Sequence, residues 1–309
     1  MAVAARIDPK GLFAPDEWAP LTRRSAWRGL ALVAHAWAVI FAAGAMAVLW
    51  PLTIPLAVAI IGARQLGLAI LMHDAAHGAL HPNLKVNDWV GDHLTSGQLH
   101  AYRPYHLTHH KYAQQAEDPD LVLSAPFPIT RQSLRRKVVR DLTGQTFWKQ
   151  KWAPLVARLR ARRPGEPLWP ILRAGLVQRR RFMAGMAATL AVTVPFGLWW
   201  VWPVLWLLPQ ATWLPLVTRL RNIAEHACVA KDEPDPLRHA RTTAANWLER
   251  AFIAPYWVNY HCEHHMFMHL PCYHLPRAHR LLREKGVLER MLTAPGYLDV
   301  LRQASARAA

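Results

Sequence analysis

The sequence predicts an all-α integral membrane protein, with four transmembrane helices in two hairpins and a cytoplasmic helical cap that carries histidine-rich motifs. Three observations predict this fold class. Two long stretches lack charged residues, the basic residues gather outside them, and the histidines cluster at helical spacing beside them. No repeat or low-complexity linker interrupts the sequence, and we expect a single domain over residues 1–309.

The two charge-free stretches are the first element of this prediction. Residues 29–63 and 182–218 contain no Asp, Glu, Lys or Arg. A spanning helix needs about 20 residues to cross a hydrocarbon core of about 30 Å. Each stretch is therefore long enough for a tight helical hairpin, whereas a pair of helices in a soluble core would rarely run so far without a charge. The expected spans cover about residues 30–50, 51–72, 182–200 and 203–220.

Four prolines interrupt the second stretch, namely Pro195, Pro203, Pro209 and Pro215. Proline removes a backbone N–H donor and disfavours the interior of a helix. Non-helical backbone is tolerated at membrane depth where protein or a cavity satisfies it. The boundaries of the third and fourth spans are therefore less sharply defined, and a kinked or re-entrant arm is compatible with the pattern.

The basic residues define the expected orientation. Lys and Arg number 37 against 20 Asp and Glu, which gives a formal net charge of +17. They gather near the amino terminus and between the hairpins, so the positive-inside rule places both termini and a cap of residues 73–181 and 221–309 in the cytoplasm. Nucleic acid is an alternative partner for so basic a chain. The bases lie beside apolar stretches and alternate with Trp148 and Trp152, so attraction to anionic lipid headgroups explains them better, and we expect no nucleic-acid partner.

The histidines are arranged in motifs. Residues at i, i+3 and i+4 share one face of a helix. The sequences HDAAH, HLTHH and HCEHH begin at His73, His106 and His261, and Asn222 and His226 are also one turn apart. Neutral imidazole is a good ligand for Fe, Zn, Cu and Ni, and several convergent faces can hold a pair of ions. All four segments fall on the same predicted side of the membrane, which indicates one shared metal site.

The order HDAAH, HLTHH, NIAEH, HCEHH among two pairs of apolar stretches resembles the membrane fatty acid desaturase superfamily, over about residues 30–282. The stretches 117–120 and 259–260 also look similar to that family. The resemblance implies two iron ions, with Asn222 contributing through a water molecule; the spacing alone does not separate iron from zinc. The implied ligands are His73, His77, His106, His109, His110, His226, His261, His264 and His265.

The implied activity is O2-dependent desaturation of a long fatty acyl chain that is linked to a lipid or to a thioester. An unactivated C–H bond has neither an acidic proton nor a leaving group, so redox chemistry at a cofactor is required. The sequence has no dinucleotide-binding glycine motif and no fused haem-domain signature. The resemblance therefore implies an external electron donor of ferredoxin-like or cytochrome type.

Other functions stay open at this point. A hydroxylase or ketolase of an acyl chain, an alkane or a carotenoid would use the same di-iron site. A metal transporter with histidine-rich loops is disfavoured, because transporters place ionisable groups near the middle of the membrane. A soluble zinc hydrolase is disfavoured because no HExxH motif occurs.

Some residues near the motifs have less defined roles. We expect Asp74, Glu225 and Glu263 to orient ligating imidazoles by accepting their second N–H. His279 has no comparable spacing and is expected to be an ordinary polar residue. Arg64 interrupts the second span, where a charge is costly unless it pairs, reaches the interface or meets water. It marks a route towards the metals or anchors the helices.

His35 lies in the first span and is expected to have a structural role. The three cysteines all fall in the proposed cytoplasmic part. Their number is odd and cytoplasm is reducing, so free thiols are expected at Cys228, Cys262 and Cys272.

Overall fold

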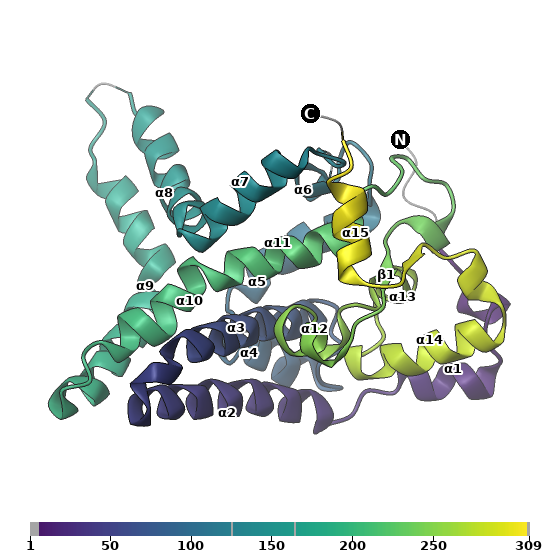
Figure 1. The fold of residues 1–309 in the computed structure, drawn as a ribbon, viewed down its shortest axis with the longest axis horizontal. Helices are drawn as coiled ribbons and strands as arrows, with labels where there is room; N and C mark the ends of the chain where they lie inside the picture. Colours follow the sequence, from purple (N-terminus) through teal and green to yellow (C-terminus); the bar gives the residue numbers. More distant parts are fainter. Residues whose placement is uncertain (1–5, 125, 164, 308–309) are drawn as a thin grey trace. The chain divides into compact units, whose positions relative to one another are not determined.

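The computed structural model describes residues 6–124, 126–163 and 165–307, and it is mostly helical, as predicted (Figure 1). Within these residues the only strands are β1 (Thr242–Thr243) and β2 (Thr293–Ala294), which pair in parallel with Thr242 opposite Thr293. The helices are α1 (Pro15–Thr22), α2 (Arg28–Leu49), α3 (Ile54–Ala76), α4 (Leu84–His93), α5 (Leu99–Lys111), α6 (Leu121–Ser124), α7 (Arg131–Leu142), α8 (Gln145–Arg160), α9 (Trp169–Thr193), α10 (Leu208–Ala211), α11 (Trp213–His226), α12 (Trp247–Phe252), α13 (His261–Met266), α14 (Leu275–Glu284) and α15 (Tyr297–Ala304).

The chain forms two compact units. Unit 1 comprises residues 1–40, 63–135 and 217–309, and unit 2 comprises residues 41–62 and 136–216. Unit 1 contains all of the histidine motifs. The two units are therefore described separately, and the functional site belongs to unit 1 alone.

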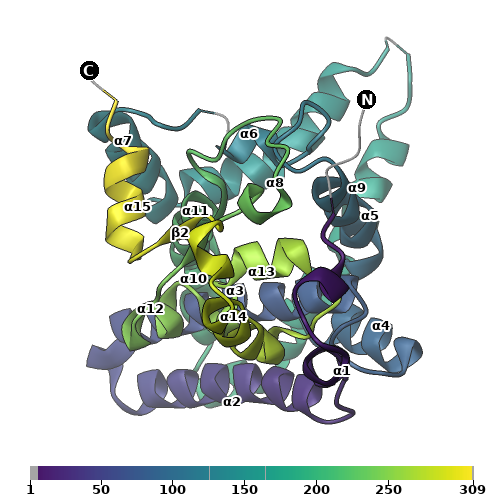
Figure 2. The same cartoon turned by 90° about the vertical axis from the view of Figure 1, so that its right-hand side faces the viewer.

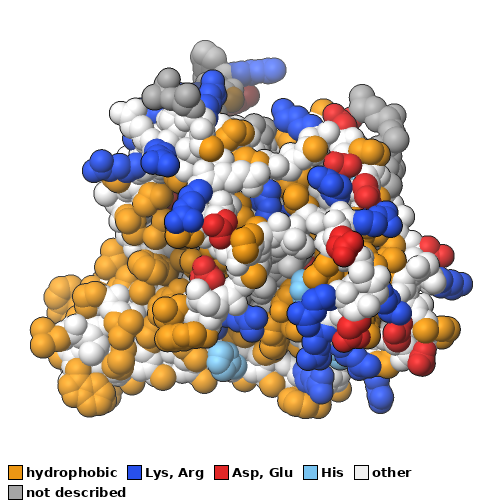
Figure 3. Space-filling model, turned by 45° about the vertical axis from the view of Figure 1, so that its right-hand side comes forward, with side chains coloured by type: hydrophobic (Ala, Val, Ile, Leu, Met, Phe, Trp, Pro, Cys, Tyr) orange, Lys and Arg blue, Asp and Glu red, His pale blue; other side chains and the backbone are white. Residues whose placement is uncertain are grey.

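The first predicted hairpin corresponds to α2 and α3. By length and composition, the helices over Arg28–Leu49 and Pro51–Ala76 are apolar and long enough to cross a membrane. Helix α3 extends four residues beyond the predicted end at residue 72, because it continues into the HDAAH motif. Phe41 is 68% exposed and Leu52 is 97% exposed, and Figure 3 shows hydrophobic side chains gathered on the molecular surface. Apolar surface of this kind favours contact with lipid.

In unit 2, the segment predicted as the second hairpin is divided into shorter helical pieces. Helix α9 begins at Trp169, upstream of the expected start at 182, and its first half contains arginines. It ends at Thr193, where Pro195 lies in a short 3-10 turn. The returning segment contains a π-helical turn over Trp202–Leu207, followed by α10 and α11. The prolines explain these interruptions, because each lacks the N–H that an uninterrupted helix uses.

Unit 1 packs its helices around α13. Helix α13 contacts α14 and β1, and α4 contacts α5 (Figure 2). Gly91 allows α4 to approach α3 closely, since a Cβ at this position would lie 2.6 Å from the Cβ of Ala75. Asn83 caps the start of α4 by accepting backbone N–H bonds through its side chain. A separate apolar cluster joins Ile223 of α11 to Val300 of α15. Helix α4 thus connects two histidine-bearing helices, α3 and α5, and α11 packs against α15.

Candidate metal centre

Four segments of unit 1 carry the predicted histidines. His73 lies in the last turn of α3, and His77 follows the end of that helix. Helices α5 and α13 each carry one HxxHH motif, and α11 ends at His226. The structure brings all nine histidines together in two groups: His73, His77, His106, His110 and His264 form group A, and His109, His226, His261 and His265 form group B.

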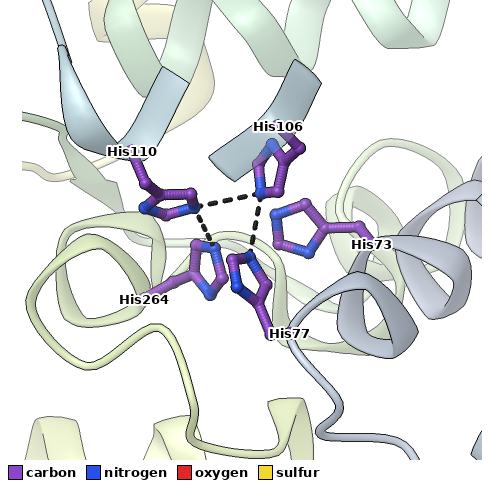
Figure 4. Close-up of side chains that lie close together, drawn as sticks. All are labelled: His73, His77, His106, His110 and His264. Carbon is purple, nitrogen blue, oxygen red and sulfur yellow. Dashed lines mark hydrogen bonds between the residues drawn. The ribbon is translucent and has the colours of Figure 1, made fainter. Parts of the chain in front are cut away.

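The five side chains of group A are buried, and they lie close together (Figure 4). One ring nitrogen from each of its five histidines lies within 4.8 Å of one nitrogen from every other member. Nε2 of His106 lies 2.9 Å from Nε2 of His77 and 3.0 Å from Nε2 of His110. Nε2 of His264 lies 3.0 Å from Nε2 of His110. Imidazoles from three helical segments therefore converge on one small volume.

Group B has the same arrangement with four rings. Nε2 of His261 lies 2.9 Å from Nε2 of His226 and 3.2 Å from Nε2 of His265. Nε2 of His109 lies 3.3 Å from that of His265. His226 is 9% exposed and His265 is partly exposed, so group B is less completely buried than group A.

Burial favours the neutral form of most of these imidazoles. Burial lowers the pKa of His77 to about 3, with smaller contributions from neighbouring cationic groups. Burial likewise holds the pKa of other members well below the usual value, namely His106, His110, His226, His261, His264 and His265. A neutral imidazole retains one nitrogen lone pair, which is the form that binds a metal ion.

The donor set fits two metal ions. Neutral rings whose Nε2 atoms face one another at about 3 Å have too few protons for every pair to form a good hydrogen bond. Both ring nitrogens of His73, and Nδ1 of His77 and His261, have no hydrogen-bond partner among the described residues. Buried polar groups normally have partners, and a cation at the centre of each group would supply them. Imidazole suits iron, zinc, copper and nickel.

A buried carboxylate orients one histidine of group B. Nδ1 of His109 donates to Oδ1 of Asp118 at 2.8 Å, and both side chains are at most 2% exposed. Asp118 also accepts backbone N–H bonds from Gln114 and Asp120, which hold the carboxylate in place. Such a bond fixes the ring orientation and raises the basicity of the opposite nitrogen. Sequence reasoning noted residues 117–120 without assigning this contact.

Glu225 and Asp74, two carboxylates within the motifs, have different bonding partners. Oε2 of Glu225 lies 3.5 Å from Nε2 of His261, and Glu225 pairs with Arg221 at 2.6 Å. Burial raises the pKa of Glu225 to about 7, against the opposing effect of Arg221. Asp74 instead accepts the backbone N–H of Cys272 at 3.0 Å, so it ties α3 to the segment before α14.

Glu263 points away from the imidazoles of its own motif. It accepts hydrogen bonds from the Thr242 hydroxyl and, at 2.5 Å, from Nδ1 of His279. Contrary to the expectation from the sequence, Glu263 therefore does not orient a ligating imidazole. It links α13 to β1 and α14 instead. His279, expected to be an ordinary polar residue, anchors α13 through this contact.

Gln114 is a site residue that sequence reasoning missed. Its side chain is buried, and its Nε2 lies 3.3 Å from Nδ1 of His226. Its φ of 63° places it in the left-handed region, which is uncommon for a residue other than glycine. The one signal in the sequence is its position a helical turn after His110, directly beyond the end of α5.

A cavity of about 40 Å³ lies beside group B and is lined by Asn222, Tyr102, Asp120 and Glu225, together with histidines of both groups. A water molecule needs at least about 10–15 Å³ by this kind of measure, so the cavity has room for water next to Asn222. The Tyr102 ring stacks on His106, with centroids 5.1 Å apart and planes inclined by 10°. Asn222 thus lines the same cavity as histidines of both groups.

The three cysteines are free thiols, as predicted. Cys262 and Cys272 are buried, and Cys228 is partly exposed. Cys262 lies inside its motif, but its Sγ donates to the carbonyl of Leu237. It therefore packs away from the ring nitrogens of group B.

Comparison with known proteins shows similarity to desaturases. The sequence model of the family described as "Fatty acid desaturase" matches residues 49–292. The chain is 29% identical to the dihydrorhizobitoxine desaturase of Bradyrhizobium elkanii over 264 residues, which cover 80% of this chain and 70% of that protein. It is 24% identical to the chloroplastic omega-6 fatty acid desaturase of Brassica napus over 258 residues, which cover 75% of this chain and 54% of that protein. The match thus spans about half the length of the plant relative.

Proposed function

This chain belongs to the fatty acid desaturase family, and from that premise we propose that it is a membrane oxidoreductase that desaturates a long fatty acyl chain with O2. The observation that carries the proposal is the convergence of nine histidines into two groups, one of five and one of four. The substrate is an acyl chain linked to a lipid or to a thioester, and the electrons come from an external donor.

Two iron ions, when bound, supply the redox chemistry that an unactivated C–H bond requires. The residues of group A would hold one ion and those of group B would hold the other. Asn222 contributes to the site through a water molecule in the adjacent cavity. Asp118 holds His109 in the tautomer whose Nε2 carries the lone pair. Burial lowers the pKa of most of these imidazoles, which favours the neutral form that binds a cation.

The membrane arrangement follows from the apolar helices and the distribution of charge. The two apolar helices and the family indicate association with a membrane. We propose four spans, with both termini and the histidine groups on the cytoplasmic side, because the basic residues gather there. His73 would then lie directly after the second span, on the cytoplasmic side.

The basic cytoplasmic surface supports a donor of opposite charge. A net charge of +17 attracts an acidic ferredoxin-like or cytochrome-type protein and accelerates encounter at low salt. The rate of electron delivery is therefore expected to fall as ionic strength rises. A rate that does not change with salt would contradict this part of the proposal.

The substrate and the outcome define the alternatives. One relative is named an omega-6 fatty acid desaturase and the other a dihydrorhizobitoxine desaturase. The two names share desaturation but give different substrates. Hydroxylation or ketolation of an acyl chain, an alkane or a carotenoid at the same histidines is the second candidate. It differs from desaturation in that the product gains oxygen.

The decisive experiment expresses the chain in a host that lacks the activity and profiles its lipids by mass spectrometry. We expect new alkenes, no added oxygen, and two irons per purified chain. His109→Ala should abolish the product, whereas the matched control His93→Ala should retain it, because His93 is exposed and bonds only to its own helix. An alcohol or ketone product would favour the second candidate. A product retained in His109→Ala would remove the metal assignment.

A further inference from the structure

Arg64 is a buried cation outside the nine-histidine centre. It lies in the apolar helix α3 and is 7% exposed. Its Nη2 donates to the carbonyl of Ala251 in α12, and its guanidinium carbon lies 5.5 Å from the centroid of the Tyr256 ring. A charge within an apolar helix is retained only where specific partners stabilise it. These contacts connect α3 to the segment that leads into α13.

That segment contains a strained turn. Tyr256 and Trp257 have φ values of 54° and 59°, so two consecutive residues with large side chains adopt the left-handed region. Such conformations are unfavourable for residues other than glycine, and they persist only where surrounding contacts hold them. Helix α13 begins at His261, soon after this turn, so the direction of the turn sets the position of that helix.

Two further contacts hold the Tyr256 ring. The hydroxyl of Tyr256 shares a hydrogen bond of 3.1 Å with Nδ1 of His35 in α2. Gly67 of α3 leaves room for the ring, because a Cβ there would lie 2.7 Å from Cε2 of Tyr256. Tyr256 therefore contacts α2 through its hydroxyl and α3 through its ring. Among the described residues, Arg64 is the charged side chain that contacts the ring.

We propose that Arg64 is a positioning residue for the metal centre, acting through the Tyr256–Trp257 turn on the three histidines of α13. The effect falls unequally on the two groups. Helix α13 supplies two of the four histidines of group B, His261 and His265, but only one of the five in group A, His264. Displacement of α13 therefore weakens group B more than group A. This inference rests on the proposed function in that the two groups hold iron.

The test compares purified, detergent-solubilised proteins. We expect two irons per chain in the unmodified protein and about one in Arg64→Met, with the spectroscopic signature of a coupled iron pair replaced by that of a single ion. Arg64→Lys should restore most of the second iron, because it keeps a donor for Ala251 and a cation beside Tyr256. Arg280→Met is the matched control, since Arg280 is exposed on α14, and it should retain both irons.

Gly67→Ala provides a second variant that leaves Arg64 in place but displaces the Tyr256 ring. Gly67→Ala should cause the same selective loss of iron. If Arg64→Met aggregates, this variant still tests whether the Tyr256 ring positions α13. Hydrogen exchange of the α13 amides in metal-free protein should also become faster in both variants. Two irons retained in both variants, with unchanged exchange over α13, would overturn the inference. An unmodified protein without iron would instead contradict the proposed function, and the exchange measurement would still test the role of Arg64.

Discussion

Asp118 and His109 form a buried pair in which Nδ1 of the imidazole donates to the carboxylate at 2.8 Å. The bond leaves Nε2 as the nitrogen with the lone pair, and Nε2 faces the Nε2 of His265 at 3.3 Å. Asp118, in the loop after α5, thus determines which nitrogen of His109 faces the other histidines of group B. Its carboxylate is in turn held by two backbone N–H groups.

The first prediction concerns this pair. Asp118→Asn removes the charge that raises the basicity of His109 while retaining the size of the side chain. We expect iron affinity at group B to fall about 10- to 100-fold, as is usual for partners of metal-ligating histidines. Chelator competition measures the affinity directly. Glu117→Gln is the control, because Glu117 is partly exposed and precedes the buried position; an equal effect of both variants would contradict the specific role of Asp118.

Metal removal should occur in two phases. Group B has four histidines, of which His226 is 9% exposed and His265 is partly exposed, whereas group A has five buried histidines. A chelator such as EDTA should therefore remove about one iron per chain before the other. Release is followed by absorbance and by iron analysis of the remaining protein. His265→Ala should accelerate the fast phase alone and His77→Ala the slow phase alone; a single phase in all three proteins would argue against two separable groups.

Close packing of α4 on α3 predicts a stability effect. Gly91→Ala places a Cβ at 2.6 Å from the Cβ of Ala75, and overpacking of this kind costs about 1–3 kcal/mol. The unfolding midpoint in detergent should fall accordingly. Gly185→Ala, at a helical position of α9 with no atom within 4 Å of the added Cβ, should leave the midpoint unchanged or raise it slightly. Equal midpoints for the two variants would show that α4 can move away at no cost.

Thiol reactivity should separate two of the cysteines. Burial and the nearby Asp74 raise the pKa of Cys272 well above its usual value, so its reactive thiolate is scarce at neutral pH. Maleimide labelling followed by mass spectrometry should find Cys272 unmodified in the folded protein and modified after denaturation. Cys228 is partly exposed and should react in the folded protein. Raising the pH to 8.5 should leave Cys272 protected, and rapid labelling there would show that the site opens.

The spacing within each histidine motif also indicates which histidines belong to the same group. At about 100° per residue, positions i and i+4 are separated by about 40° on a helix, whereas i+3 lies about 60° away on the other side. The structure follows this rule. His106 and His110 share group A while His109 joins group B, and on α13 His261 and His265 share group B while His264 joins group A.

The second hairpin and the accessory residues were harder to predict. Helix α9 begins upstream of the charge-free stretch, because arginines are good helix formers and do not end a helix. Glu263 contacts His279 and Thr242, and Gln114 reaches His226; these partners are distant in sequence. Hydropathy and periodicity describe neighbours along one element and contain no information on contacts of this kind.

By itself, the sequence determined the helical class, the apolar hairpin of α2 and α3, the family and the nine histidines, because each of these depends on composition or on spacing along one segment. Only the tertiary structure decided which histidine belongs to which group, that Asp118 bonds to His109, and that Arg64 contacts Tyr256 in the turn before α13. The physical reason is that a metal site is formed by side chains from segments that are far apart in the chain. Their approach is fixed by side-chain packing, such as Gly67 against Tyr256, and packing is a property of the folded chain.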